Sequence, residues 1–491
     1  MKKTHLAILA ILTLFTISCV KEKGNEFKPD LPVPHVAGFE TSYSAFTFRD
    51  TLKINPTVEN EAQYSYSWTV VSSNYIVGSG IVPLGDTISR SKNLNYELKL
   101  NPGRYLLALR IQNKQTKVTQ IIPSTLNVST LTMGGWYLLK DDGIKTDFDF
   151  IYSNGRIDNW MANFNGKGLQ GKAIKSVYAG SFKKGLQSTD LYGAFVAITD
   201  QDAAIFRIDN GKMVMSFDDM FFTKPAVRKP QNILQPQSDF SFHLINDGKV
   251  YTLSKGAFFA DPPASTYKIS SVAAVGSLGI AFDENNKSVI WLDGINYTAL
   301  PATGNLLKNM NANPIWIGGY PGLRSAGLAL FRRASGEGFL VKLNLSYGTM
   351  LGYGGTPPLI TDSKSVIASH GLMNADAIGG NYDSDYIYYA KENRIYLTDF
   401  ASLPESLQVT LPAGEIVTSI QHIKYPVPAT GVAPTTDYLA ISSYSAGKYK
   451  VWLHTISSTG TIATLVQPTF QGDGKVACVN YVQQGIGNKS Y

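Results

Sequence analysis

Three places in the chain bring acidic side chains close together in sequence, and paired carboxylates are what glycoside hydrolysis requires. They are Asp141–Asp142, Asp218–Asp219, and Asp383 with Asp385. In such a pair one carboxyl group acts as the acid and the other as the base or nucleophile. Carboxylate oxygens also bind Ca²⁺, which Asp147 and Asp149 could do. The favoured interpretation is that these are turn residues that accept hydrogen bonds from nearby backbone. We therefore assign no catalytic residue and no metal site.

The segment Gly166–Ala173 has the glycine and lysine spacing of a phosphate-binding Walker A loop. Ala173 stands where that loop needs a Ser or Thr for Mg²⁺, and neither the preceding strand nor the following helix is evident, so we predict that it binds no nucleotide. A G-x-S-x-G nucleophile motif is absent. The histidines are scattered without the spacing of metal ligands, at His5, His35, His243, His370, His422 and His454. No cofactor is expected.

Four aromatic residues lie among turn-forming residues and are the candidate ligand-binding residues: Trp160, Trp316, Tyr320 and Tyr353. Flat rings on an exposed face would stack on sugars or hold peptide side chains. For any one of them, burial in the core is the commoner alternative.

The elements that must position these residues are short strands, because an apolar strand, a polar turn and a second strand recur through residues 129–491. The first strands of these units begin at Ala194, Phe240, Gly279, Leu328, Tyr386 and Tyr438. A β unit that recurs every 40 to 50 residues is typical of a β-propeller, in which each unit is one four-stranded blade. Parallel β-solenoids are a poor alternative because their repeats are shorter and contain no hairpins.

A further unit beginning at Trp136–Leu139 brings the expected number of blades to about seven. Lys475–Tyr481 is then expected to close the ring beside the first blade. Outer strands should lie between the hairpins, for example Glu415–Ile423.

Residues 38–128 show a different pattern, with short alternating strands about every ten residues. Tyr64, Tyr66, Trp68 and Val70 alternate and should share one face of a strand. This spacing around a central tryptophan predicts an immunoglobulin-like β-sandwich, with Trp68 and Tyr105 in its core.

Two motifs resemble a known family. Tyr66-Ser67-Trp68, followed by Pro102-Gly103-Arg104-Tyr105 and the alternating residues to Asn113, is similar to the signature of PKD-like domains. Gly135-Trp136-Tyr137-Leu138-Leu139, continuing to Asp147-Phe148-Asp149-Phe150-Ile151, resembles the junction that follows this domain in PKD-like lipoproteins of Gram-negative bacteria. The resemblance implies a surface lipoprotein that helps a SusC/SusD-type outer-membrane uptake system to capture a nutrient. It carries over no catalytic residue.

The N-terminus predicts a lipoprotein signal peptide over residues 1–18. Lys2 and Lys3 precede an apolar run from Leu6 to Ile17 that is too short to span a bilayer, and Ser18 precedes Cys19. Ser18-Cys19 resembles a bacterial lipobox, and this resemblance implies that Cys19 is the lipidation site; an ordinary secretory signal with a chance cysteine is the alternative. Residues 19–37 are polar and proline-containing and should form an extended tether. Cys478 is then left without a disulfide partner.

Composition excludes two classes of protein. The chain has 491 residues, of which 44% are hydrophobic, 11% aromatic and only 16% charged, so it is not intrinsically disordered. Its net charge of +7 is not gathered into a dense basic segment, and nucleic acid is therefore not expected as a partner.

We therefore expect an all-β chain: an N-terminal PKD-like sandwich followed by a β-propeller of about seven blades over residues 129–491. The expected function is non-catalytic, either capture of a glycan or peptide or docking onto a SusC/SusD-like transporter. The expected location is the outer membrane, lipid-anchored and exposed on the cell surface. A propeller enzyme acting on glycans or peptides and a purely structural subunit of the uptake complex are the alternatives.

Overall fold

The computed structural model describes residues 33–47, 50–72, 82–100, 103–129, 134–153, 155–185, 188–236, 241–254, 258–262, 266–275, 278–292, 297–299, 305–319, 325–351, 358–425 and 436–483. The chain forms two compact units, which meet in sequence between residues 129 and 130.

The first unit is a β-sandwich, as the alternating pattern predicts. Its larger sheet has the strand order β2-β9-β8-β5-β6, in which β2 runs parallel to β9. The strands are β2 (Ser42–Phe46), β9 (Thr119–Ser129), β8 (Gly103–Asn113), β5 (Tyr64–Ser72) and β6 (Asp86–Ser89). Two antiparallel pairs complete the unit: β1 (Val36–Ala37) with β4 (Thr57–Val58), and β3 (Thr51–Ile54) with β7 (Leu94–Glu97).

Trp68 lies at the centre of the sandwich core. Its side chain is fully buried, and its indole N–H donates to the backbone oxygens of Ser91 (3.0 Å) and Lys92 (3.2 Å). Tyr105 packs partly buried against the same apolar cluster. The core role expected for both residues is confirmed.

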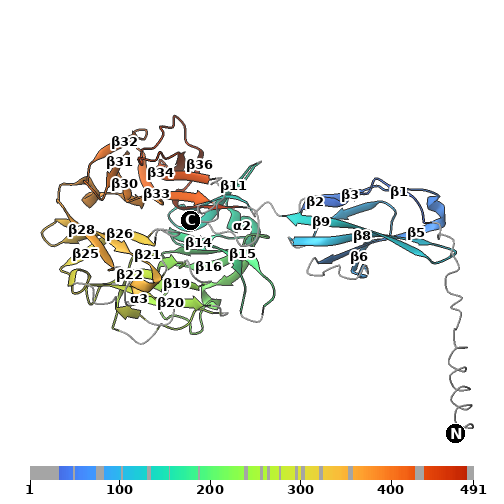
Figure 1. Ribbon diagram of the computed structural model, residues 1–491, viewed down its shortest axis with the longest axis horizontal. Coiled ribbons are helices and arrows are strands. Elements are labelled where there is room, and N and C mark those ends of the chain that lie inside the picture. The colour runs from blue at the N-terminus through green and yellow to red at the C-terminus, as the bar shows by residue number, and fades with distance from the viewer. Residues whose placement is uncertain are drawn as a thin grey trace, which may run out of the picture. The chain divides into compact units, whose positions relative to one another are not determined.

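The second unit is a β-propeller, and its described residues form seven sheets arranged around a centre (Figure 1). Blade 1 consists of β37 (Lys475–Val482), β10 (Gly135–Asp141), β11 (Lys145–Tyr152) and β12 (Gly155–Ile157), with the short β13 (Leu169–Gln170) beside β11. Blade 2 is β14 (Ala173–Phe182), β15 (Tyr192–Thr199), β16 (Ala203–Arg207) and β17 (Met213–Ser216). Blade 3 is β18 (Pro230–Leu234), β19 (Ser241–Asn246) and β20 (Lys249–Ser254).

The remaining blades follow the same up-and-down order. Blade 4 is β21 (Ile269–Val275), β22 (Gly279–Asp283), β23 (Ser288–Leu292) and β24 (Tyr297–Ala299). Blade 5 is β25 (Ala312–Gly319), β26 (Ala326–Arg333), β27 (Gly338–Asn344) and β28 (Ile360–Val366). Blade 6 is β29 (Ala377–Gly380), β30 (Tyr386–Lys391), β31 (Arg394–Asp399) and β32 (Ser406–Thr410). Blade 7 is β33 (Ile416–Tyr425), β34 (Thr436–Ser445), β35 (Lys448–His454) and β36 (Phe470–Asp473).

The ring closes through strand pairing between residues that are far apart in sequence. The innermost strands pack in the order β37, β14, β18, β21, β25, β29, β33 and back to β37. Strand β37 pairs antiparallel with β10, so that Leu138 lies opposite Val479. The expectations of about seven blades and of closure by Lys475–Tyr481 are both confirmed.

The expected position of Glu415–Ile423 was wrong, because β33 is the innermost strand of blade 7. Its polar residues suggested an outer strand, but they bond to the neighbouring inner strand β37. The amide of Gln421 accepts from the backbone N–H of Val479 (2.8 Å), and the hydroxyl of Thr418 donates to the oxygen of Val476 (2.6 Å). Polar side chains on this strand therefore satisfy buried backbone groups.

Helices are few and short. The described residues contain α2 (Trp160–Asn165), which follows β12, and α3 (Tyr347–Leu351), which follows β27. Within the described part of the chain, neither helix has the length or apolar character needed to cross a bilayer.

Candidate functional site

A polar cavity of the propeller lies where blade 1 meets blade 7. It has a volume of about 690 Å³ and is bordered by the turn between β10 and β11, by β12, by α2 and the segment after it, and by the end of β36. We call it the blade 1–7 cleft. Its lining is rich in charged side chains of both signs, among them Lys145, Asp147, Arg156, Lys167 and Asp473.

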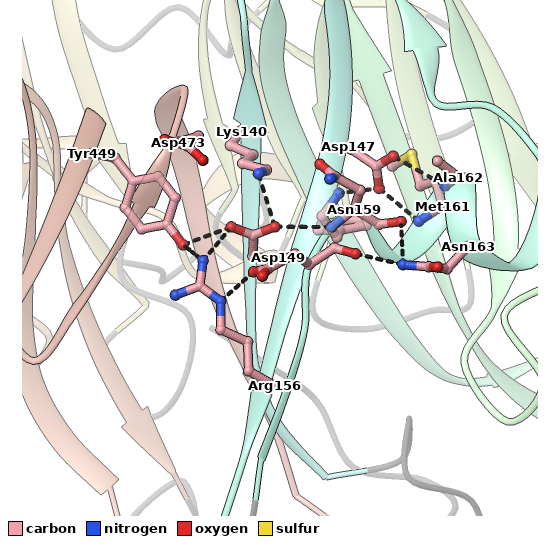
Figure 2. Close-up of polar contacts among 12 residues, drawn as sticks. Lys140, Asp147, Asp149, Arg156, Asn159, Met161, Ala162, Asn163, Tyr449 and Asp473 are labelled. Carbon is pink, nitrogen blue, oxygen red and sulfur yellow. Dashed lines mark hydrogen bonds and ion pairs between the residues drawn. The ribbon is translucent and has the colours of Figure 1, made fainter. Parts of the chain in front are cut away.

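Asp149 on β11 organises the charges behind this cleft (Figure 2). Its carboxylate is fully buried, and each of its oxygens accepts two hydrogen bonds. One oxygen accepts from Lys140 Nζ (2.9 Å) and from the backbone N–H of Asn159 (3.0 Å). The other accepts from Arg156 Nη2 (2.7 Å) and from the hydroxyl of Tyr449 (2.7 Å). The carboxylate has no acceptor position left for a metal ion or a substrate.

The Tyr449 hydroxyl is held as a donor by its surroundings. Burial, together with the negative charge of Asp149, raises the pKa of Tyr449 well above its usual range, so that the hydroxyl stays protonated. The same oxygen accepts a hydrogen bond from Arg156 Nη2 (2.6 Å). Tyr449 lies on β35, so the buried ion pair of blade 1 is linked directly to blade 7.

Asp147 holds the start of α2. Its carboxylate accepts from the backbone N–H groups of Phe148 (2.7 Å), Met161 (2.6 Å) and Ala162 (3.0 Å), as Figure 2 shows for the last two. The helix begins after Asn159, whose own side chain does not cap it. Burial raises the pKa of Asp147 to about 6, although the three N–H groups and Lys140 oppose the shift.

Asp147 and Asp149 thus act as structural acceptors of hydrogen bonds. A calcium site needs carboxylate oxygens that are free to face the ion, whereas these oxygens face N–H, O–H and ammonium donors. The arrangement therefore favours the turn-and-backbone role over the calcium alternative for this pair.

Asp141 and Asp142 are turn residues, as the favoured interpretation predicts. Asp142 accepts from the backbone N–H groups of Ile144 (2.9 Å) and Lys145 (2.7 Å), and these bonds lower its pKa. Asp141 accepts from the N–H groups of Gly143 (2.9 Å) and Ala173 (3.1 Å). Neither is arranged as one half of an acid–base pair.

The segment with Walker-like spacing forms part of the cleft wall. Gly166 ends α2 in the left-handed conformation (φ 76°), and the chain continues into β13 and β14 and not into a helix. Gly168 passes so close to β11 that a Cβ would lie 2.4 Å from the oxygen of Thr146. These glycines serve helix termination and close packing, which supports the prediction that no nucleotide binds here.

Two lysines are the groups of the cleft that remain available to a ligand. Lys145 and Lys167 are exposed and line the cleft, and among the described residues neither forms an ion pair. Arg156 by contrast is engaged by Asp149, Asp158 and the backbone oxygen of Gln471. The cleft therefore offers two free ammonium groups beside carboxylates that are already bonded.

The aromatic residues proposed for ligand binding are not brought together by the structure. Trp160 is fully buried in α2, where its ring contacts Tyr137, Phe148, Phe164 and Phe206. Its expected place on an exposed face was wrong, because α2 turns the ring into the core between blades 1 and 2. Trp316 on β25 is half-buried and packs against the core of blades 5 and 6. Tyr320, Tyr353 and the lipidation site Cys19 lie outside the described residues.

The other acidic spots are separate ion pairs. Asp218 pairs with Lys224 (2.8 Å) and Arg228, whereas Asp219 accepts from the hydroxyl of Ser216 (2.5 Å). Asp385 pairs with Lys342.

Asp383 belongs to a different cluster, in which its carboxylate, that of Asp437 and the ring of His422 place ligand atoms within 4.8 Å of one another. The ammonium of Lys424 already lies between the two carboxylates, at 2.7 Å and 3.0 Å. His422 accepts the N–H of Tyr382 at Nδ1 (2.7 Å), so its Nε2 carries the proton that Asp437 accepts (2.8 Å). A metal ion would have to displace both cationic and N–H donors, so the cluster fits no metal as it stands.

Comparison with known proteins agrees with this architecture for part of the chain. The model of the PKD-like family matches residues 19–173. No curated protein matches the chain.

Solved structures that resemble the chain are at low identity. A quinoprotein alcohol dehydrogenase-like protein from Bacteroides thetaiotaomicron is 13% identical, with 91% of this chain and 99% of that chain covered and a TM-score of 0.39. The β-propeller domain of Swd1 from Myceliophteria thermophila is 10% identical, covering 65% and 98% respectively, with a TM-score of 0.36. The WD40 domain of SCAP from fission yeast is 10% identical, covering 62% and 74%, with a TM-score of 0.34.

The residues that organise the cleft were missed as a group by sequence reasoning. Asp149 was noticed only for its acidity, and its partner Tyr449 lies 300 positions away. A signal for this buried cluster was present in the sequence, because Lys140, Asp147 and Asp149 stand within otherwise apolar strands. Charged residues in such strands are seldom buried without a partner of opposite charge.

Proposed function

We propose that this protein is a non-catalytic binding protein, lipid-anchored through Cys19, which holds a polar ligand in the blade 1–7 cleft. The ligand class is a glycan or a peptide, both of which offer many hydrogen-bonding groups. The observation that carries the proposal is the cleft itself: it is large enough for a small ligand, and it presents the free ammonium groups of Lys145 and Lys167.

The bonding of the cleft carboxylates supports binding over catalysis. Asp142 and Asp147 are bonded to backbone N–H groups, Asp158 to Arg156 and Asp473 to Lys448. Glycoside hydrolysis needs two carboxyl groups that can reach the substrate, one acting as acid and the other as base or nucleophile. A rigid cleft with preset hydrogen-bond partners instead lowers the entropy cost of holding a ligand.

The sharpest experiment measures ligand binding by isothermal titration calorimetry with oligosaccharides and short peptides, using the full chain in detergent. The double variant Lys145→Ser/Lys167→Ser should weaken binding at least tenfold, because it removes both free cations. Lys249→Ser is the matched control, since Lys249 is an exposed lysine of blade 3. Equal binding by the double variant and the wild type, or binding of neither ligand class by the wild type, would overturn the proposal.

An enzyme that cleaves glycans is the second candidate, and one observation favours it. The pKa of Asp147 is raised to about 6 in a cleft, and carboxylic acids tuned in this way often serve as general acids. Turnover of a glycan by the wild type that is lost in Asp147→Asn, while the helix content persists, would establish the enzyme and refute the binding-only function.

The proposed anchoring beside a transporter would explain why the protein binds a ligand. We propose that the protein acts on the outer surface of the outer membrane, beside a SusC/SusD-like importer, where tethering raises the local concentration of ligand. Mild detergent purification through an affinity tag should then recover a transporter and its partner lipoprotein. Recovery of the tagged protein alone would contradict the proposed transporter complex. It would equally contradict a purely structural role in that complex, but it would not contradict ligand binding in the blade 1–7 cleft.

A further inference from the structure

A second cavity lies on the inner strands of the propeller, away from the blade 1–7 cleft. It has a volume of about 710 Å³ and is found where the innermost strands of blades 2, 3 and 4 begin. The three strands contribute Lys175 of β14, Asn232 of β18 and Ser271 of β21, and each of these is the third residue of its strand. We call it the inner-strand cavity.

Lys175 is unusual because its partly buried ammonium has no carboxylate partner among the described residues. Its Nζ contacts the side-chain oxygen of Asn232 at 3.3 Å. That oxygen is fixed in place, since the amide nitrogen of Asn232 donates to the backbone oxygen of Ser271 (2.8 Å). Burial lowers the pKa of Lys175, and the neighbouring thiol of Cys478 opposes this shift only in part.

Other lysines with little exposure each pair with a carboxylate, whereas Lys175 pairs with none in the described part of the chain. Lys140 pairs with Asp149 (2.9 Å), Lys424 with Asp383 and Asp437 (2.7 and 3.0 Å), and Lys450 with Glu415. For Lys424, burial lowers the pKa, but the two carboxylates outweigh it and the pKa is raised. Removing charge from water is costly unless an opposite charge compensates it, and among the described residues the Lys175 position lacks the carboxylate that its counterparts have.

The other residues of the cavity wall also favour a negatively charged ligand. Lys229 lines it as a second cation, and the Gln231 side-chain oxygen is occupied by the N–H of Gly248 (2.6 Å), leaving its amide donors. The acidic residue of the wall is Asp200, whose carboxylate already accepts the backbone N–H of Lys172 (2.7 Å). The cavity therefore offers two ammonium groups and amide donors to an incoming acceptor.

We propose that the inner-strand cavity binds the carboxylate of a small acidic ligand, such as a uronic acid sugar, with Lys175 and Lys229 as its charge partners. This site is separate from the blade 1–7 cleft and does not depend on the function proposed for that cleft. It adds selectivity for acidic ligands at the inner strands of the ring.

The test follows the Lys175 side chain by NMR in full-length protein labelled with ¹³C at lysine Cε. Acetate and D-galacturonate are the probes, and D-galactose is the matched neutral sugar. Both acids should shift the Lys175 signal and raise the pKa of Lys175, because an anion stabilises the ammonium. D-galactose should leave the signal unchanged. Absence of a response to both acids, or an equal response to D-galactose, would overturn the proposal.

Variants separate a specific site from loss of folding. Lys175→Met should weaken binding of D-galacturonate at least tenfold in calorimetry, whereas Lys172→Met, which removes an exposed lysine nearby in sequence, should leave it unchanged. Lys175→Arg retains the cation and should retain binding, and circular dichroism checks that each variant is folded. Unchanged binding in folded Lys175→Met would refute the site. In Lys145→Ser/Lys167→Ser the Lys175 response should persist, so failure at one site is distinguished from failure at the other.

Discussion

Asp149 on β11 and Tyr449 on β35 share a hydrogen bond of 2.7 Å across the boundary between the first and last blades, although 300 positions separate them in the sequence. The bond belongs to a cluster that also holds the buried Lys140 and the partly exposed Arg156 (Figure 2). The ring is therefore closed twice, by the backbone pairing of β37 with β10 and by this side-chain linkage.

Removing the carboxylate of Asp149 should destabilise the propeller strongly. Asp149→Ala leaves Lys140 buried without a partner, and breaking a buried ion pair in this way costs about 3–5 kcal/mol in the free energy of unfolding. Tyr449→Phe should cost about 2 kcal/mol, as expected for a bond to a charged group. Urea denaturation measures both, with Tyr444→Phe on β34 as the control. A loss below 1 kcal/mol in Asp149→Ala would show that the linkage does not stabilise the ring.

Trp160 should behave as a core residue. Trp160→Ala removes a fully buried ring, and such a truncation costs about 3–5 kcal/mol in unfolding free energy. Trp160→Phe should cost less because it keeps part of the ring contacts. Thermal denaturation and ligand calorimetry check this prediction. If a Trp160 variant has wild-type stability but no longer binds ligand, Trp160 stacks on the ligand and is not a core residue.

The stability of the protein should carry a pH-dependent contribution from Asp147. Its pKa rises from 3.8 to about 6 on folding, so the folded state binds the proton more tightly. The resulting stabilisation is complete below pH 3.8 and is lost as the pH rises through 6.

Asp147→Asn removes this titration, so the unfolding free energy of the variant relative to the wild type should rise by up to about 3 kcal/mol between pH 4 and 7. A difference between Asp147→Asn and the wild type that stays constant over this pH range would contradict the raised pKa.

The two cysteines of the chain allow a controlled test of the proposed lipid anchor, in which Cys19 is the site tested and Cys478 is the control. Cys19→Ser should move the protein from the membrane fraction to the soluble fraction, because the proposed acyl chains would be attached through that thiol. Cys478→Ser should leave the protein in the membrane fraction, since Cys478 is a buried free thiol of β37. Fractionation followed by immunoblotting measures both, and membrane retention of Cys19→Ser would contradict lipidation.

Much of the fold could be predicted because it is encoded locally. The turn Asn246–Gly248 between two alternating apolar runs specifies the β19–β20 hairpin, and the same pattern recurs in the other blades. Closure by Lys475–Tyr481 followed from counting these units. The β33 strand was misplaced because its polar residues bond to β37, a partner that no local pattern reveals.

The site was less predictable because its interactions are not local. Helix α2 was missed since its cap is Asp147, 14 residues before Met161, and not the residue that precedes the helix. Trp160 looked exposed among turn residues, yet this helix buries it. The surroundings of Lys175 are built by strands of three different blades. The alternation of residues along one strand cannot predict which side chains those strands bring together.

Closure of blade 1 by β37 has a consequence for biogenesis. As the chain emerges from the N-terminus, β10 presents an unpaired edge until the six other blades have followed and residues 475–482 arrive. Such an edge is a template for intermolecular strand pairing. Contacts between distant segments also form slowly. The partly formed propeller must therefore be kept from associating with other chains until its last strand is in place.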